Sequence, residues 1–281
     1  AVKSLILNRL ENPLLSPFDT PYHSIPFSKI KSEHFITALK KNIERALKQI
    51  DELTQQTASP SFENTMEPLQ NTGALLERNS AILFNLNSAE TSDAIQAVTQ
   101  QAAPLLTKFQ NDIRLNQALF ERIKTIYENR EKENLTTEQL TLLEKEFKGF
   151  VRNGALLSED EKDILREIDT EKAQLSLSFG ENVLADTNDF SLHVTDEKQL
   201  DGLPDQVKEM AAEIAKSKNK TGWVFTLDYP SYVPFMTYLE DRTLRREMSL
   251  AYGKRGFQKN DPNNSEIILK IIVCTKFIMQ I

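Results

Sequence analysis

The residues that could carry chemistry in this chain are few, and none has a catalytic spacing. The chain has three histidines, His23, His34 and His193, and one cysteine, Cys274. The histidines lie far apart, so the helical zinc motif His-Glu-x-x-His is absent. A single cysteine excludes a thiolate zinc cluster and an internal disulfide framework. A Gly-rich phosphate loop and a Gly-x-Ser-x-Gly elbow are also absent. We therefore expect no catalytic residue, no metal site and no cofactor in this chain.

One group of side chains could bind a ligand. Tyr229 and Tyr232 precede the basic residues Arg242 and Arg245 in the sequence. Tyrosine offers flat contact area, and arginine can hold a carboxylate through two parallel hydrogen bonds. These four residues are therefore predicted to face a bound peptide. In the alternative interpretation, the arginines only form ion pairs with acidic residues of the same segment.

The elements that must position these residues are mostly helices. Apolar residues recur at spacings of three and four, which predicts amphipathic helices over 32–53, 66–83, 95–113, 119–126, 140–151 and 158–183. Thr136 with Gln139, and Ser158 with Glu161, have the spacing of capping boxes. Helices in succession with short links predict an all-α fold, a multi-helix array.

The two ends of the chain differ from this helical pattern. Four prolines in the first 30 residues predict an extended arm. Two β-prone runs, 190–194 and 223–227, predict one small two-stranded β element, and helical pattern resumes at 231–252 and after Pro262. The predicted organisation is an arm, a helical domain and a mixed segment, at residues 1–31, 32–185 and 186–281.

Composition limits the partners and the location. With 41 acidic against 34 basic residues among 281, the net charge of −7 argues against a nucleic-acid partner. No apolar run approaches the ~20 residues of a membrane span, and residues 1–10 lack the apolar run of a signal peptide. We expect no membrane partner and a cytoplasmic location. A periplasmic location stays open, because a removed signal peptide would leave no trace.

Several short phrases, in their order along residues 12–270, resemble one protein family. They include Asn12-Pro-Leu-Leu15, Phe62-Glu-Asn-Thr65, Phe150-Val-Arg-Asn-Gly154, Gly202-Leu-Pro204 and Thr226-Leu-Asp-Tyr-Pro-Ser231. The chain is similar to the N-terminal half of the thimet oligopeptidase family of zinc metallopeptidases. Within that family it most resembles the bacterial peptidyl-dipeptidase (dipeptidyl carboxypeptidase) branch.

This resemblance implies a hydrolase built from two helical halves that enclose a channel and cleave short peptides. It also implies that the zinc motif, the general-base glutamate and the third zinc ligand lie in a C-terminal catalytic half outside this chain. The chain would then be the N-terminal substrate-channel region of a zinc-dependent oligopeptidase or peptidyl-dipeptidase, catalytically incomplete by itself. The alternative hypothesis is a non-catalytic helical module for peptide binding or protein interaction.

The last residues depart from the family's pattern, which we interpret as a truncation or a shifted reading frame. Eleven of the fifteen residues in 267–281 are apolar. A surface helix is normally apolar along one stripe only. We therefore expect exposed apolar surface here, and either self-association through 267–281 or folding of this segment back onto the channel side.

Overall fold

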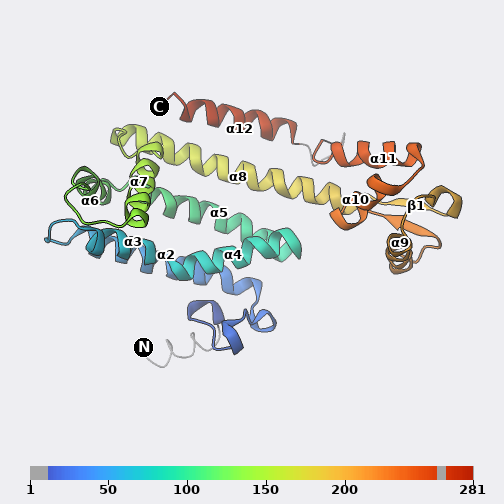
Figure 1. The fold of residues 1–281 in the computed structure, drawn as a ribbon, viewed down its shortest axis with the longest axis horizontal. Coiled ribbons are helices and arrows are strands. Elements are labelled where there is room, and N and C mark those ends of the chain that lie inside the picture. Colours follow the sequence, from blue (N-terminus) through green and yellow to red (C-terminus); the bar gives the residue numbers. More distant parts are fainter. Residues whose placement is uncertain (1–11, 258–263, 281) are drawn as a thin grey trace. The chain divides into compact units, whose positions relative to one another are not determined.

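A computed structural model describes residues 12–257 and 264–280 (Figure 1). The chain divides into two compact units, the first comprising residues 1–174 with 274–281 and the second residues 175–273. The predicted all-α fold with one two-stranded element is confirmed. Within the described ranges, no helix is both long and apolar enough to cross a membrane.

The first unit is a helical array preceded by short turns. Its turns of 3-10 helix are η1 (Pro13–Leu15), η2 (Pro21–His23) and η3 (Phe27–Lys29), and a π-helical turn, η4, covers Phe62–Met66. Its helices are α2 (Ser32–Thr54), α3 (Glu67–Asn71), α4 (Ala74–Ala89), α5 (Asp93–Arg114), α6 (Gln117–Glu128), α7 (Thr137–Arg152) and the start of α8 (Glu159–Asp189).

The second unit contains the two strands. After the end of α8 come β1 (Leu192–Val194), the 3-10 turn η5 (Glu197–Leu200), α9 (Asp205–Ser217), β2 (Trp223–Phe225), α10 (Tyr229–Tyr238), α11 (Arg242–Gly253) and most of α12 (Ser265–Ile278). The strands pair antiparallel with His193 opposite Val224. One apolar cluster joins this ribbon to α10, where the rings of Phe225 and Phe235 lie 4.7 Å apart.

Both predicted capping boxes are present. The Gln139 N–H donates to Thr136 Oγ1 at 3.2 Å, and the Thr136 N–H donates to Gln139 Oε1 at 3.0 Å. At the start of α8, the Ser158 N–H donates to Glu161 Oε2 at 2.9 Å. These reciprocal bonds satisfy backbone donors that a helix start leaves unpaired, so they fix where α7 and α8 begin.

The helix expected over 66–83 is interrupted. Helix α3 ends at Asn71 and α4 begins at Ala74, because Thr72 is extended and Gly73 has a φ of 80°. A residue in this left-handed region cannot continue a right-handed helix, and glycine adopts it without steric cost. Apolar residues keep a helical spacing on both sides of the break, so their spacing alone did not predict that the helix is interrupted.

The helical pattern over 231–252 also contains a break. Helix α10 ends at Tyr238, and Asp241 caps the start of α11. One oxygen of Asp241, Oδ1, accepts the N–H groups of Thr243 at 2.8 Å and Leu244 at 3.0 Å. The cap places Arg242 and Arg245 on a helix separate from the two tyrosines.

The described part of the predicted arm joins the core of the first unit. Leu14 is fully buried with apolar residues of α2, α4 and α5. Its carbonyl accepts from Asn79 Nδ2 at 2.7 Å, and the Ser16 carbonyl accepts from Arg78 at 3.1 Å. A second cluster, around Phe120 and Phe150, joins α6 and α7 to the end of α2. These two cores hold the helices that line the cavity described below.

Candidate functional site

The two tyrosines predicted to face a peptide lie on one helix, α10, and differ in exposure. Tyr229, in the first turn of α10, is 73% exposed, and Tyr232, one turn further, is half-buried. Tyr232 stacks on Tyr252 of α11, with ring centroids 4.0 Å apart. The guanidinium of Arg255 lies 3.5 Å from the centre of the Tyr252 ring. Tyr232, Tyr252 and Arg255 thus form one stack, of which the sequence analysis named only Tyr232.

The predicted arginines lie on α11, at its first and fourth residues. Arg242 is exposed and Arg245 half-buried. Among the residues that the structure describes, neither they nor Arg246 forms an ion pair, so pairing within the helix is not observed. These side chains therefore remain able to meet an anionic group. Arg255, by contrast, is engaged, since it donates to the Tyr252 carbonyl at 3.0 Å and to Thr187 Oγ1 at 3.2 Å.

The three histidines have separate local partners. His23 Nδ1 lies 3.0 Å from the Phe18 carbonyl and His193 Nε2 lies 2.6 Å from the Thr221 carbonyl. His34 Nδ1 accepts the Lys31 N–H at 3.1 Å, at the start of α2. Over 12–257 and 264–280, no three His, Cys, Asp or Glu side chains come together in a way that could hold a metal ion. The residues described therefore do not fit a zinc site.

The surroundings of Cys274 disfavour its thiolate form. Its side chain is 5% exposed, and burial, with the nearby Glu171 carboxylate, raises the pKa of the thiol. A thiol held in its protonated form is a poor nucleophile and a poor metal ligand. Its place in an apolar helix fits a packing role.

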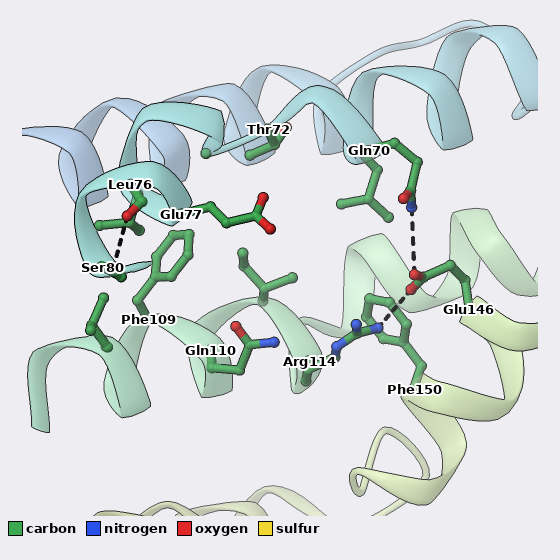
Figure 2. Close-up of a pocket in the computed structure, with 14 residues that line it drawn as sticks. Gln70, Thr72, Leu76, Glu77, Ser80, Phe109, Gln110, Arg114, Glu146 and Phe150 are labelled. Atoms are coloured by element: carbon green, nitrogen blue, oxygen red, sulfur yellow. Dashed lines mark hydrogen bonds and ion pairs between the residues drawn. The ribbon is translucent and has the colours of Figure 1, made fainter. Parts of the chain in front are cut away.

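A cavity of about 520 Å³ lies within the first unit, between α3, α4, α5 and α7 (Figure 2). This volume is in the range of small-molecule sites. Apolar side chains from all four helices form much of its wall: Leu69, Leu76, Leu106, Phe109, Ile113 and Phe150. The break at Gly73 shapes one side, because Thr72 and Gly73 both line the cavity.

Three charged side chains line the same cavity, and two of them are paired. Arg114 Nη1 lies 2.7 Å from Glu146 Oε2, and its guanidinium lies 4.9 Å from the centre of the Phe150 ring. Gln70 Nε2 also donates to Glu146, at 3.4 Å. Figure 2 shows Arg114 turned toward Glu146, while the Glu77 carboxylate points into the space between α4 and α5.

The cavity has no recognisable signature in the amino-acid sequence. Its lining residues come from four elements spread over positions 69–150, and none belongs to a chemical motif. The one local signal was Gly73 within an otherwise apolar stripe. An isolated glycine in a helical pattern marks a position with a packing or functional reason.

Comparison with known proteins finds a family domain and several longer relatives to which the chain is similar. Residues 36–162 match the family model described as Neurolysin/Thimet oligopeptidase, N-terminal domain. The chain is 30% identical over 268 residues to oligopeptidase A of Escherichia coli K12, covering 94% of this chain and 39% of the relative. It is 31% identical over 263 residues to dipeptidyl carboxypeptidase of Salmonella typhimurium LT2, covering 93% of this chain and 38% of the relative.

A plant relative matches the chain with similar identity and coverage. The chain is 31% identical over 274 residues to a probable cytosolic oligopeptidase A of Arabidopsis thaliana, covering 93% of this chain and 37% of the relative. The chain thus spans less than two fifths of the length of these relatives. The family resemblance noted in the sequence is confirmed: residues 36–162 match the N-terminal domain of neurolysin and thimet oligopeptidase, and the relatives that the chain matches are much longer than the chain.

Proposed function

We propose that the chain is the N-terminal substrate-channel region of a zinc-dependent oligopeptidase or peptidyl-dipeptidase that hydrolyses short peptides. The observation that carries this proposal is the coverage of the matches. Relatives named oligopeptidase A and dipeptidyl carboxypeptidase match 93–94% of this chain, which spans only 38–39% of them. The catalytic chemistry then belongs to a further region of the complete protein.

The zinc ion and its ligands are part of that further region in this proposal. Zinc, when bound, polarises the peptide carbonyl and the attacking water. The described residues of this chain do not fit a zinc site, so we assign them peptide binding only. Arg242 and Arg245 are free to hold a peptide carboxylate, and Tyr229 and Tyr232 supply flat contact area.

The coding DNA beyond Ile281 tests the proposal first. We expect it to encode His-Glu-x-x-His, in the same or a shifted frame, and the protein produced from it to hold one zinc and cleave short peptides. Chelation should abolish the cleavage. A coding region without this motif in any frame would contradict the proposal and favour the non-catalytic peptide-binding or interaction module.

The arginines can be tested in the same complete protein. Arg242→Gln and Arg245→Gln should raise KM for peptides with a free carboxyl terminus and leave KM for amidated peptides unchanged. Arg246→Gln, on the same helix but outside the proposed contact, is the control. Equal effects on free and amidated peptides would show that the two arginines do not bind a carboxylate.

The location proposed for the protein is the cytosol. It rests on the Arabidopsis thaliana relative named as cytosolic. Fractionation of cells that produce the complete protein should recover it with cytosolic markers. Recovery with periplasmic markers would contradict this.

A further inference from the structure

We propose that the cavity between α3, α4, α5 and α7 binds a protonated primary amine carried by a small apolar group, with Glu77 as its counter-ion. The proposal goes beyond the proposed function, because it concerns a ligand site within the first unit. It rests on the charges, the free polar atoms and the apolar wall of this one cavity.

The charges favour a cation. Arg114 and Glu146 neutralise each other at 2.7 Å, and the Arg114 guanidinium also lies over the Phe150 ring. Glu77 is the third charged residue of the lining. Over the described residues its carboxylate has no ion pair. The cavity therefore carries one uncompensated negative charge, and an anion would have to displace Glu146 from Arg114.

The hydrogen-bonding capacity of the hydroxyl groups in the cavity wall also favours an ammonium ligand. Thr72 Oγ1 donates its hydrogen to the Pro68 carbonyl at 2.9 Å, and Ser80 Oγ donates to the Leu76 carbonyl at 2.8 Å. Their oxygens can still accept, as can the Glu77 carboxylate. An ammonium group has three donors and no acceptor, so it can donate to the Thr72 and Ser80 hydroxyl oxygens and to the Glu77 carboxylate.

The apolar wall requires more than a bare cation. Leu76 and Phe109 are buried, and with Leu106 and Ile113 they line the cavity around Glu77. About 520 Å³ accommodates an alkyl chain or a small peptide side chain beside the ammonium group. Two sources share this chemistry, a free alkylamine and the N-terminal residue of a peptide.

Titration of the chain followed by NMR tests the proposal, with n-hexylamine, n-hexanol and hexanoate as probes. Hexylamine should bind more tightly than hexanol, and hexanoate least. The amide signals of Glu77, Phe109 and Ile113 should shift. Because Glu77 lines the cavity but is exposed to solvent, Glu77→Gln should weaken hexylamine binding about fivefold and leave hexanol binding unchanged.

Two further variants separate binding from folding. Glu67→Gln, an equal loss of charge on α3 outside the cavity lining, should leave hexylamine binding unchanged. Arg114→Gln should strengthen it, because Glu146 then loses its ion pair with Arg114 and adds a second uncompensated negative charge. An increase for hexylamine with no increase for hexanol would be specific to the proposed charges, because apolar surface exposed by damage to the fold would strengthen the binding of both probes.

Peptide probes distinguish the two sources. If the natural ligand is a peptide N-terminus, Leu-Leu-amide should bind at least as tightly as hexylamine, and acetylation of its amine should abolish this. If only hexylamine binds, the ligand is a free alkylamine. Equal binding of hexylamine and hexanoate, an unchanged affinity in Glu77→Gln, or no binding at all would overturn the proposal. These results would not affect the proposed function, because that function is tested separately, by zinc-dependent peptide hydrolysis with the complete protein.

Discussion

Arg122 is a buried arginine that joins segments distant in the sequence. It is 7% exposed, and its guanidinium donates to Thr65 Oγ1 at 3.1 Å, Asn64 Oδ1 at 3.0 Å and the Gln56 carbonyl at 3.2 Å. We expect Arg122→Met to lower the free energy of unfolding by about 3 kcal/mol, because these acceptors lose their donor away from water. Urea unfolding followed by circular dichroism measures the change.

Lys124→Met, on the same helix, is the control for this loss of charge. The Lys124 side chain is 39% exposed and its ion pair with Glu121 is long, at 3.9 Å, so the variant should change stability by less than about 0.5 kcal/mol. Equal losses in both variants would show that the hydrogen bonds of Arg122 contribute nothing specific. The partners of Arg122 lie 57 to 66 residues away, which explains why sequence spacing could not predict them.

Asp169 on α8 makes stability depend on pH. Burial raises the pKa of its carboxyl group. The folded chain therefore holds this proton more tightly than the unfolded chain, whose Asp pKa is about 3.9. The contribution of Asp169 to the free energy of unfolding should decrease as the pH rises from that value through the raised folded-state pKa, and then level off.

Asp169→Asn removes this dependence. The variant should therefore gain stability relative to the unmodified chain between pH 3 and pH 7, as measured by urea unfolding at both values. Glu167→Gln removes an exposed carboxylate from the same helix and is the control for the loss of one negative charge. The difference in the free energy of unfolding between Asp169→Asn and the unmodified chain should change with pH. If this difference is the same at pH 3 and pH 7, Asp169 is not the source of the pH dependence.

At the scale of elements, the sequence predicted helix starts better than helix breaks. The starts of α7 and α8 depend on side chains within three residues, such as Thr136 with Gln139, so the local pattern contains the whole signal. The break before α4 depends on the backbone of Gly73, which the apolar stripe includes without interruption. The spacing of apolar residues predicts which face of a segment is buried. It does not predict whether the segment forms one continuous helix or two helices separated by a break.

Two glycines allow a matched test of this difference. Gly73 has a φ of 80°, so Gly73→Ala should cost about 1 kcal/mol of stability from backbone strain. Gly180 lies inside α8, and an added Cβ there would meet no atom within 4 Å. Gly180→Ala should therefore stabilise the chain by about 1 kcal/mol. Thermal unfolding compares the two, and a Gly73→Ala variant as stable as Gly180→Ala would show that the break is not rigidly required.

At the scale of the whole molecule, the fold class followed from periodicity, whereas the cavity did not. The all-α array needs only local apolar stripes, and these are repeated along the chain. The cavity needs Leu69, Glu77, Phe109 and Glu146 brought together from four helices. That arrangement is set by how the two cores of the first unit pack, which no single segment encodes.

Helix α12 carries an exposed apolar stripe, as the sequence predicted for 267–281. Leu269, Ile272, Val273 and Phe277 follow one another at spacings of three, one and four, and each is more than half exposed. Cys274 is buried, and Ile267, Ile268, Ile271 and Ile278 are half-buried. The helix thus has one covered and one uncovered apolar side. Residue 281 lies outside the described residues.

We propose that two copies of the chain associate through this stripe, because burying apolar surface gains about 25 cal/mol per Å². Light scattering should show a mass that rises with concentration for the unmodified chain, whereas Leu269→Gln/Ile272→Gln should remain monomeric. Leu156→Gln/Leu250→Gln, equal changes at exposed leucines elsewhere, should associate like the unmodified chain. A constant monomer mass of the unmodified chain at all concentrations would refute the proposal, and an equal effect of both double variants would place the contact elsewhere.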